Sequence, residues 1–198
     1  MGQAGMAEAA VRYLRSTRPA APVEPLPRPE LRCVGEDERV PVGQAEFRRV
    51  LGNFATGVAV ITAPAAEGEC GPAGFACQSF SALSLDPPLV VFMVGRTSTT
   101  WPRIARAGVF CVNVLADHQG ALCRGFAVSG ADKFAGVAYD AAPRSGAPRL
   151  AGALAWIDCT IHAVHTGGDH LIVVGRVDAL GTGDEEAAPL LFHKGRFR

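Results

Sequence analysis

Residues 74–101, GFACQSFSALSLDPPLVVFMVGRTSTTW, are the stretch that decides how the chain folds. In its first half, serines alternate with apolar residues, as in a strand at a sheet edge whose hydroxyls and amides face a ligand. The run 89–94 is continuously apolar and β-branched at its centre, which predicts a strand buried on both faces. The hydroxyl-rich segment 96–100 then precedes Trp101 and Pro102, and proline after Ser or Thr predicts a helix start. The stretch therefore predicts two strands followed by the first turn of a helix.

The composition fits one globular domain. With 198 residues, of which 48% are hydrophobic, the chain can build a single core without a second domain. Its 19 basic and 19 acidic residues cancel, so it lacks the broad basic surface that nucleic acid or an anionic membrane requires. No run approaches the roughly 18 apolar residues of a membrane helix, and the N-terminus lacks the apolar segment of a secretory signal. We therefore expect neither nucleic acid nor a membrane as a partner.

The six cysteines are scattered along the chain without a CxxC pair. Cys111 and Cys159 lie within apolar runs, and the simplest interpretation is reduced, mostly buried thiols in a cytoplasmic protein. Cys77 and Cys123 have no neighbouring base in the sequence that would activate them, so burial is favoured over reactivity.

Residues 1–43 are rich in Ala, Pro, Arg and Glu, and we expect them to form a largely disordered extension. The compact domain is expected to span residues 44–198. It begins with a helix, because four apolar residues recur there at helical spacing and form one stripe. These residues are Phe47, Val50, Leu51 and Phe54.

The remaining predicted elements are mostly strands. The turn residues Gly167, Gly168 and Asp169 join two of these strands into a hairpin. Many strands with few short helices predict a mainly β, antiparallel barrel, and the absence of GxGxxG argues against a Rossmann nucleotide site. Strands are predicted at 56–63, 109–115, 154–164, 170–177 and 189–193, short helices at 101–107 and 117–126, a weaker helical turn at 129–136, and an irregular loop at 139–152.

A candidate phosphate site lies just before Trp101. The amides of a helix N-terminus favour an anion, and a guanidinium and hydroxyls beside them add charge-assisted hydrogen bonds. A capped helix with a solvated arginine explains the same pattern about as well. The serines of the preceding strand could equally be its solvent face. The residues concerned are Arg96, Ser98, Thr99 and Thr100, with Ser79, Ser81 and Ser84 before them.

The turn at 167–170 could present the His170 imidazole and the Asp169 carboxylate to a ligand. From these residues alone, a plain hairpin turn is the preferred interpretation. His162 and His165 lie an odd number of residues apart on a predicted strand, so they point to opposite faces, and we expect no metal site. The chain also lacks the Gly-x-Ser-x-Gly pattern of a serine nucleophile.

Seven signatures, in order along the chain, resemble the short-chain flavin reductases that have the FMN-binding split-barrel fold. The likeness covers about three quarters of the chain, and the order of the signatures makes it specific. The signatures are FRRVLGNFATGVAVIT, GFACQSFSALSLDPPLVVFMV, STTWPRI, FCVNVLADHQ, DKFAGV, GGDHLIVVGRV and HKGRF, between residues 47 and 197.

This resemblance implies an antiparallel, Greek-key-like split β-barrel that transfers hydride from NADH or NADPH to FMN or FAD. It also implies a homodimer with the flavin near the subunit interface, and a partner monooxygenase that receives the reduced flavin. The cofactors carry the reactive groups, so alignment and exclusion of water replace a dedicated acid or base. A redox-silent flavin carrier and a split-barrel oxidase that acts on a bound organic substrate are the alternatives, because fold does not settle activity.

The resemblance also assigns residues to roles. His170 would position the hydride donor, with Gly168 and Asp169 shaping its turn. The flavin phosphate would be held by Arg96, Ser98, Thr99 and Thr100. The flavin ring and ribityl chain would lie along Ala76, Cys77, Gln78, Ser79, Ser81, Ala82, Leu83 and Ser84. Lys133 and Phe134 would form a further wall, and His193, Arg196 and Phe197 would close the pocket.

The chain departs from the family pattern at three positions. Ala76 stands where a hydroxyl residue is common, which leaves only a main-chain role there. Gln78 replaces a shorter polar residue, and His118 replaces a frequent acid and receives no role. Residues 1–43 have no counterpart in the pattern.

Overall fold

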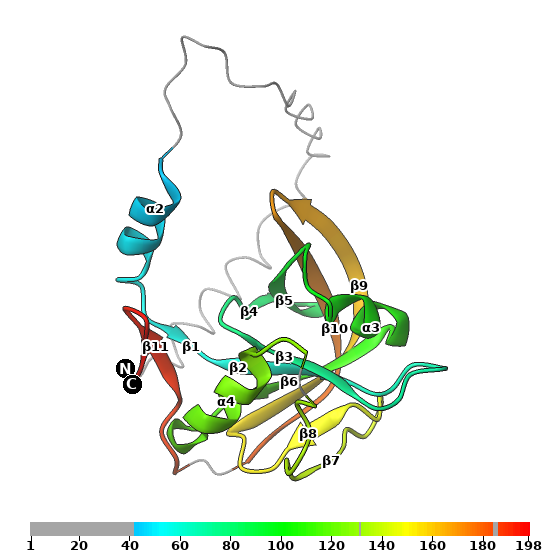
Figure 1. Ribbon diagram of the computed structural model, residues 1–198. Helices are drawn as coiled ribbons and strands as arrows, with labels where there is room; N and C mark the ends of the chain where they lie inside the picture. The colour runs from blue at the N-terminus through cyan, green and yellow to red at the C-terminus, as the bar shows by residue number, and fades with distance from the viewer. Residues whose placement is uncertain (1–41, 131, 184–185) are drawn as a thin grey trace, which may run out of the picture. The chain divides into compact units, whose positions relative to one another are not determined.

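The computed structural model describes residues 42–198 except residues 131, 184 and 185 (Figure 1). The extension predicted at residues 1–43 lies almost entirely outside the described residues. The helices are α2 (Gln44–Leu51), α3 (Trp101–Ala107) and α4 (Gly120–Ala127), with a 3-10 helix, η1 (Asp117–Gln119). The strands are β1 (Thr56–Gly57), β2 (Ala59–Ala63), β3 (Ala73–Cys77), β4 (Ser81–Leu85), β5 (Pro88–Gly95), β6 (Val109–Val114), β7 (Tyr139–Ala141), β8 (Pro148–Leu150), β9 (Ala155–Gly167), β10 (His170–Thr182), β11 (Leu191–His193) and β12 (Arg196–Phe197).

Seven strands form one sheet in the order β3-β2-β6-β9-β10-β5-β4, and every ladder in it is antiparallel. The predicted hairpin is confirmed, since β9 and β10 pair from His170 and Gly167 to Thr182 and Ala155 and form the long curved ribbon of Figure 1. A three-stranded sheet, β1-β11-β12, and the pair β7-β8 complete the described strands. The prediction of a mainly β, antiparallel fold with short helices is therefore confirmed. Within the described residues, the ladders leave the seven-stranded sheet open at β3 and β4.

The main core lies against β5, where Phe92 is fully buried among other rings. Its ring centroid lies 5.2 Å from that of Phe110, 5.9 Å from that of Phe75 and 6.3 Å from that of Trp101. Such tilted and edge-on contacts between rings add to the stabilisation that burial provides. This cluster fixes the end of β5 relative to the first turn of α3, which begins at Trp101.

Strand β5 is buried on one face only, so the prediction of burial on both faces was wrong. Val90, Phe92 and Val94 are buried, whereas Met93 is 42% exposed. The cause is the antiparallel sheet, in which one face can pack on the core while the other remains open. The continuous apolar sequence therefore places an uncovered methionine beside a cavity.

The region 139–152 contains a short hairpin, β7 and β8, where the sequence predicted an irregular loop. Side chains of neighbouring strands hold it in place. Thr62 Oγ1 and Asn113 Nδ2 both donate to the Pro148 carbonyl, and the Leu150 amide donates to Asn113 Oδ1. Because Thr62 and Asn113 are fully buried, these long-range hydrogen bonds satisfy groups that would otherwise be costly. In the region 129–136, the structure has a turn at residues 133–136 in place of the predicted helical turn.

Helix α2 forms where a helix was predicted but ends at Leu51, so Phe54 lies beyond it, and none of the residues of the helix is buried. Its apolar stripe therefore has no partner within the described part of the chain. The exposed fractions are 56% for Phe47, 50% for Val50, 52% for Leu51 and 77% for Phe54.

All five cysteines in the described residues are free, and all but Cys70 are buried. Burial raises the pKa of Cys111 to about 12 and also raises the pKa values of Cys77 and Cys159. These thiols are therefore held in the neutral form, as the sequence analysis favoured. Among residues 42–198, apart from the gaps named above, no helix is both long and apolar enough to cross a membrane.

Candidate functional site

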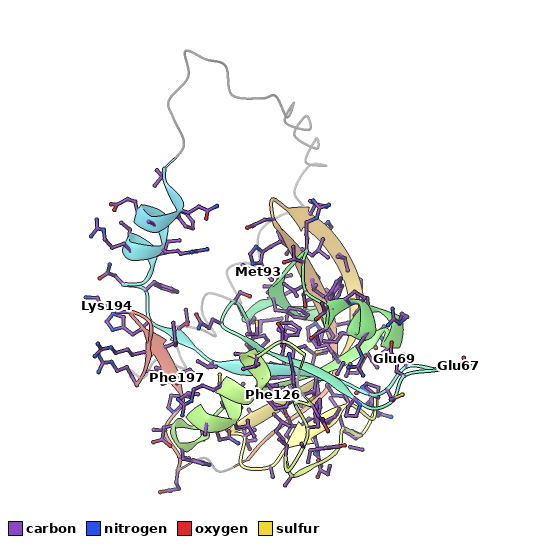
Figure 2. The ribbon with its side chains drawn as sticks, in the orientation of Figure 1. Glu67, Glu69, Met93, Phe126, Lys194 and Phe197 are labelled. Atoms are coloured by element: carbon purple, nitrogen blue, oxygen red, sulfur yellow. The ribbon has the colours of Figure 1, made fainter. Side chains whose placement is uncertain are left out.

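A cavity of about 680 Å³ opens where β3, the end of β5, α4 and the C-terminal strands meet. Met93 of β5, Phe126 of α4 and Phe197 of β12 line it and are labelled in Figure 2. The elements around it come from distant parts of the sequence, which the sheet brings together. The cavity combines apolar walls with hydroxyls, a lysine and a histidine, the usual make-up of a small-molecule site.

Lys133 places a positive charge in this wall. Its Nζ donates to the carbonyls of Gly74 at 3.1 Å and Phe126 at 3.0 Å, and lies 3.5 Å from Thr100 Oγ1. No carboxylate of the described residues forms an ion pair with it. Burial lowers the pKa of Lys133, and the nearby charge of Arg103 lowers it further. An anion in the cavity would compensate this ammonium group.

The hydroxyl segment before α3 also lines the cavity. The Ser98 hydroxyl accepts a hydrogen bond from the Trp101 amide at 3.2 Å, whereas the N-cap residue Thr100 makes no side-chain capping hydrogen bond. Helix α3 has seven residues and ends at Gly108 in the left-handed conformation. Thr99 and Thr100 remain available to the cavity, whereas Arg96 is exposed and outside this wall.

The Ser79 hydroxyl joins β5 to the segment after β3. It donates to the Met93 carbonyl at 3.0 Å and accepts from the Met93 amide at 2.9 Å. The Cys77 thiol lies 3.4 Å from the same hydroxyl. Ser79 therefore has a structural role: its hydroxyl holds the main chain of residues 76–79 along one wall of the cavity.

His170, the first residue of β10 after the β9–β10 turn, also lines the cavity. Its Nδ1 lies 2.7 Å from Asp169 Oδ1, and its side chain is 50% exposed. The hydrogen bond to His170 lowers the pKa of the Asp169 carboxyl. The Arg96 amide donates to the Asp169 carbonyl and so ties the turn to the end of β5.

The structure brings together many of the residues that the sequence analysis selected. Those in the wall of this cavity are Ala76, Cys77, Gln78, Ser79, Ser98, Thr99, Thr100, Lys133, His170 and Phe197. Phe134 lines a neighbouring cavity and Ser81 lines an apolar groove beside α2. Ala82, Leu83, Ser84, Arg96, Gly168, Asp169, His193 and Arg196 line none of these three.

Several wall residues were missed because they carry no polar signal in the sequence. Phe126 and Phe192 are apolar residues of short elements, and only the tertiary fold brings them to the site. Thr97 could have been suspected, because it directly precedes the hydroxyl residues 98–100. The missed wall residues are Val58, Phe75, Met93, Val94, Gly95, Thr97, Cys123, Phe126, Ala127, Ser129 and Phe192.

No group of three or more His, Cys, Asp or Glu side chains in the described residues could hold a metal ion.

Comparison with known proteins gives consistent results. The model of the family "flavin reductase like domain" matches residues 51–198. The reductase subunit HsaB of a flavin-dependent monooxygenase from Rhodococcus jostii (strain RHA1) is 51% identical over 151 residues, which are 76% of this chain and 75% of that protein.

Two solved structures extend this similarity. The nitrilotriacetate monooxygenase component B homolog from Mycobacterium thermoresistibile has a TM-score of 0.73 and 48% identity, and the match covers 78% of this chain and 85% of that one. The NADH:FAD oxidoreductase SgcE6 of Streptomyces globisporus, in complex with NAD and FAD fragments, has a TM-score of 0.72 and 36% identity. That match covers 85% of this chain and 96% of the other.

Proposed function

This chain belongs to the flavin reductase like domain family, and from that premise we propose that it is an NAD(P)H-dependent flavin reductase that supplies reduced FMN or FAD to a monooxygenase. One observation carries the assignment. A single cavity contains both the Lys133 ammonium group with Thr99 and Thr100, and the His170 imidazole. Lys133 with the two threonines suits a phosphate, and the His170 imidazole suits a polar group of a second ligand.

The residues present fit a flavin. Lys133 is partly buried without a carboxylate partner in the described residues, and it is held by two main-chain carbonyls. A flavin phosphate beside it would supply the missing negative charge, and the Thr99 and Thr100 hydroxyls would donate to it. The main chain of residues 76–79, fixed by Ser79, would line the flavin ring. Phe197 would close the site on the other side.

When bound, the flavin and the nicotinamide supply the hydride acceptor and the hydride donor. The chain orients them and excludes water, which accounts for a site without a nucleophile or a dedicated base. His170 would orient the nicotinamide. Asp169 would position His170, because its carboxylate accepts a hydrogen bond from the Nδ1–H group and so orients the ring.

We further propose that the protein is a homodimer with a split-barrel fold and a cytoplasmic location. The exposed stripe of α2 supports the dimer, since large exposed apolar patches mark protein interfaces. An apolar groove of about 1030 Å³ runs from Phe47, Leu51 and Phe54 to Met93 and Phe192. The last two residues also line the cavity, so a second copy in this groove would help to enclose the flavin.

Steady-state oxidation of NADH and NADPH by the purified protein, with FMN or FAD added, tests the proposed activity. Turnover with at least one combination is expected. Flavin binding without turnover would instead identify a flavin carrier, and oxidation of neither nicotinamide would rule out the reductase.

A further inference from the structure

A second cavity, of about 780 Å³, adjoins the first. It lies between α3, the loop that joins β2 to β3, and the turn that contains Lys133. Glu69, labelled in that loop in Figure 2, is in its wall with Arg103 of α3. The two cavities share Thr99, Thr100 and Lys133, the residues proposed to hold the flavin phosphate. A ligand can therefore continue from the first cavity into the second at the position of its phosphate.

A row of aromatic rings follows the same path. The Phe126 ring, in the first cavity, packs edge-on against Phe134 with centroids 5.1 Å apart. Phe134 in turn packs edge-on against Tyr139, at 5.5 Å, and these two rings line the second cavity. Tyr139 is 46% exposed, which leaves ring surface for a planar group to stack on.

The second cavity contains a second cationic group. Arg103 Nε donates to Glu69 Oε2 at 2.9 Å, and its Nη2 donates to the carbonyls of Gly71 and Pro72. Its other terminal nitrogen, Nη1, makes no hydrogen bond to the residues that the structure describes. Arg103 is close enough to Lys133 to lower the pKa of that lysine.

Carboxylates are present in the second cavity too, but both are already engaged. Glu69 pairs with both Arg103 and Arg106. Asp132 Oδ1 accepts a hydrogen bond from the Phe134 amide. A second negative charge between Lys133 and Arg103 would therefore relieve the repulsion between these two cations.

We propose that the second cavity binds the adenylate half of FAD, so that the protein prefers FAD to FMN. This inference rests on the proposed function. FAD consists of FMN and adenylate joined through their phosphates, two halves of comparable bulk, and the two cavities are of similar volume. The diphosphate would lie at the shared wall between Lys133 and Arg103, and the adenine would stack on Tyr139. FMN would occupy the first cavity alone and would leave Arg103 to share the Glu69 carboxylate with Arg106.

Binding of riboflavin, FMN and FAD to the full chain, measured by calorimetry without a nicotinamide, tests this inference. FAD is expected to bind about tenfold more tightly than FMN, the effect of one added charge-assisted contact. Arg103→Gln and Tyr139→Ala should each reduce that ratio toward one. Arg106→Gln is the matched control, because Arg106 bonds to the same Glu69 but lines neither cavity, and it should keep the ratio.

Three results would overturn the inference while the reductase assignment stands. The first is FMN binding as tightly as FAD. The second is an Arg103→Gln variant in which the ratio of FMN to FAD affinity is unchanged. If the KM for NADH, with FMN as acceptor, also rises in that variant, the second cavity binds the adenylate half of NADH instead. The third is an equal loss of FAD preference in Arg106→Gln, which would show that the arginines act by holding the loop that contains Glu69 and not by contacting FAD. If no flavin binds and no NADH is oxidised, the proposed function itself fails.

Discussion

The Nδ1 atom of His170 lies 2.7 Å from Oδ1 of Asp169, its neighbour in the β9–β10 turn. An ionised carboxylate can only accept a hydrogen bond, so Nδ1 carries the proton. The other ring nitrogen, Nε2, lies 3.9 Å from the position that a Cβ would take on Gly95, in the wall of the cavity. The turn therefore presents an imidazole of fixed orientation to whatever binds there.

Replacing His170 by Ala is expected to raise the KM for NADH about tenfold, because one orienting hydrogen bond to the nicotinamide is lost. The Kd of the flavin should change little. Steady-state kinetics and flavin titration measure the two quantities separately. His165→Ala is the control, since His165 is exposed on the same hairpin and lines none of the cavities described. An unchanged KM in His170→Ala would contradict the role given to His170.

Lys133→Met should raise the Kd of FMN about tenfold and leave the Kd of riboflavin almost unchanged. The reason is that the ammonium group would contact only the phosphate, which riboflavin lacks. Fluorescence titration with the two flavins provides the comparison within one variant. Equal weakening of both flavins would show that Lys133 supports the fold of the site and not the phosphate.

Phe54→Asp should convert the proposed dimer into monomers, because it places a charge in the apolar groove beside α2, where a second copy is proposed to bind. Sedimentation velocity measures the oligomeric state. Leu180→Asp is the control, since Leu180 is also strongly exposed, at 67%, but lies on β10 away from the stripe. A wild-type protein that sediments as a monomer would refute the proposed interface.

Glu69 should make stability depend on pH in the acid range. Hydrogen bonds from Arg106 and Arg103 hold the pKa of Glu69 below its ordinary value of 4.5. A lowered folded-state pKa means that the contribution is complete above the unfolded-state value and is lost as the pH falls through the folded-state value. The difference in unfolding free energy between the wild type and Glu69→Gln should therefore shrink below about pH 4.5. Denaturant titrations across that range would detect it, and a constant difference would argue against the ion pair.

Gly175→Ala should destabilise the fold by about 1–3 kcal/mol, the usual cost of overpacking. A Cβ there would collide with the ring of Phe110, which is fully buried and packs on Phe92. Gly57→Ala is the control, because a Cβ at Gly57 meets nothing within 4 Å. Thermal unfolding of the two variants measures the difference in stability. Equal Tm values would show that the Phe110 side chain moves aside without cost to the fold.

Patterns that depend on local chemistry predicted the fold well. The stripe of α2, the glycine after α3 and the β9–β10 turn were all recognisable because one short window contains the full signal. The hairpin of β7 and β8 was not, because its support comes from Thr62 and Asn113, which are distant in sequence. An apolar run likewise cannot say how many of its faces are covered, as Met93 shows.

The candidate site likewise contains residues that the sequence identified and residues that only the fold brings together. Lys133 was selected by resemblance alone, whereas Thr99 and His170 were also candidates from the local sequence, and all three lie in one cavity. The stretch from Ala82 to Ser84 was selected with them, but it follows an exposed edge strand outside that cavity. Its part in flavin binding stays a prediction. The Glu69 and Arg103 side of the second cavity gave no signal in the sequence, because these residues come together only when the loop after β2 folds onto α3.

Helix α2 is eight residues long and buries none of them. A helix of that length has a costly nucleation step and is marginal in water without packing. Its order would therefore depend on the arrival of a second copy, so that local folding and subunit recognition become one event. The main-chain amides of α2 would then exchange with solvent quickly in dilute protein and slowly at high concentration. The helix would act as a local reporter of how much of the protein is assembled.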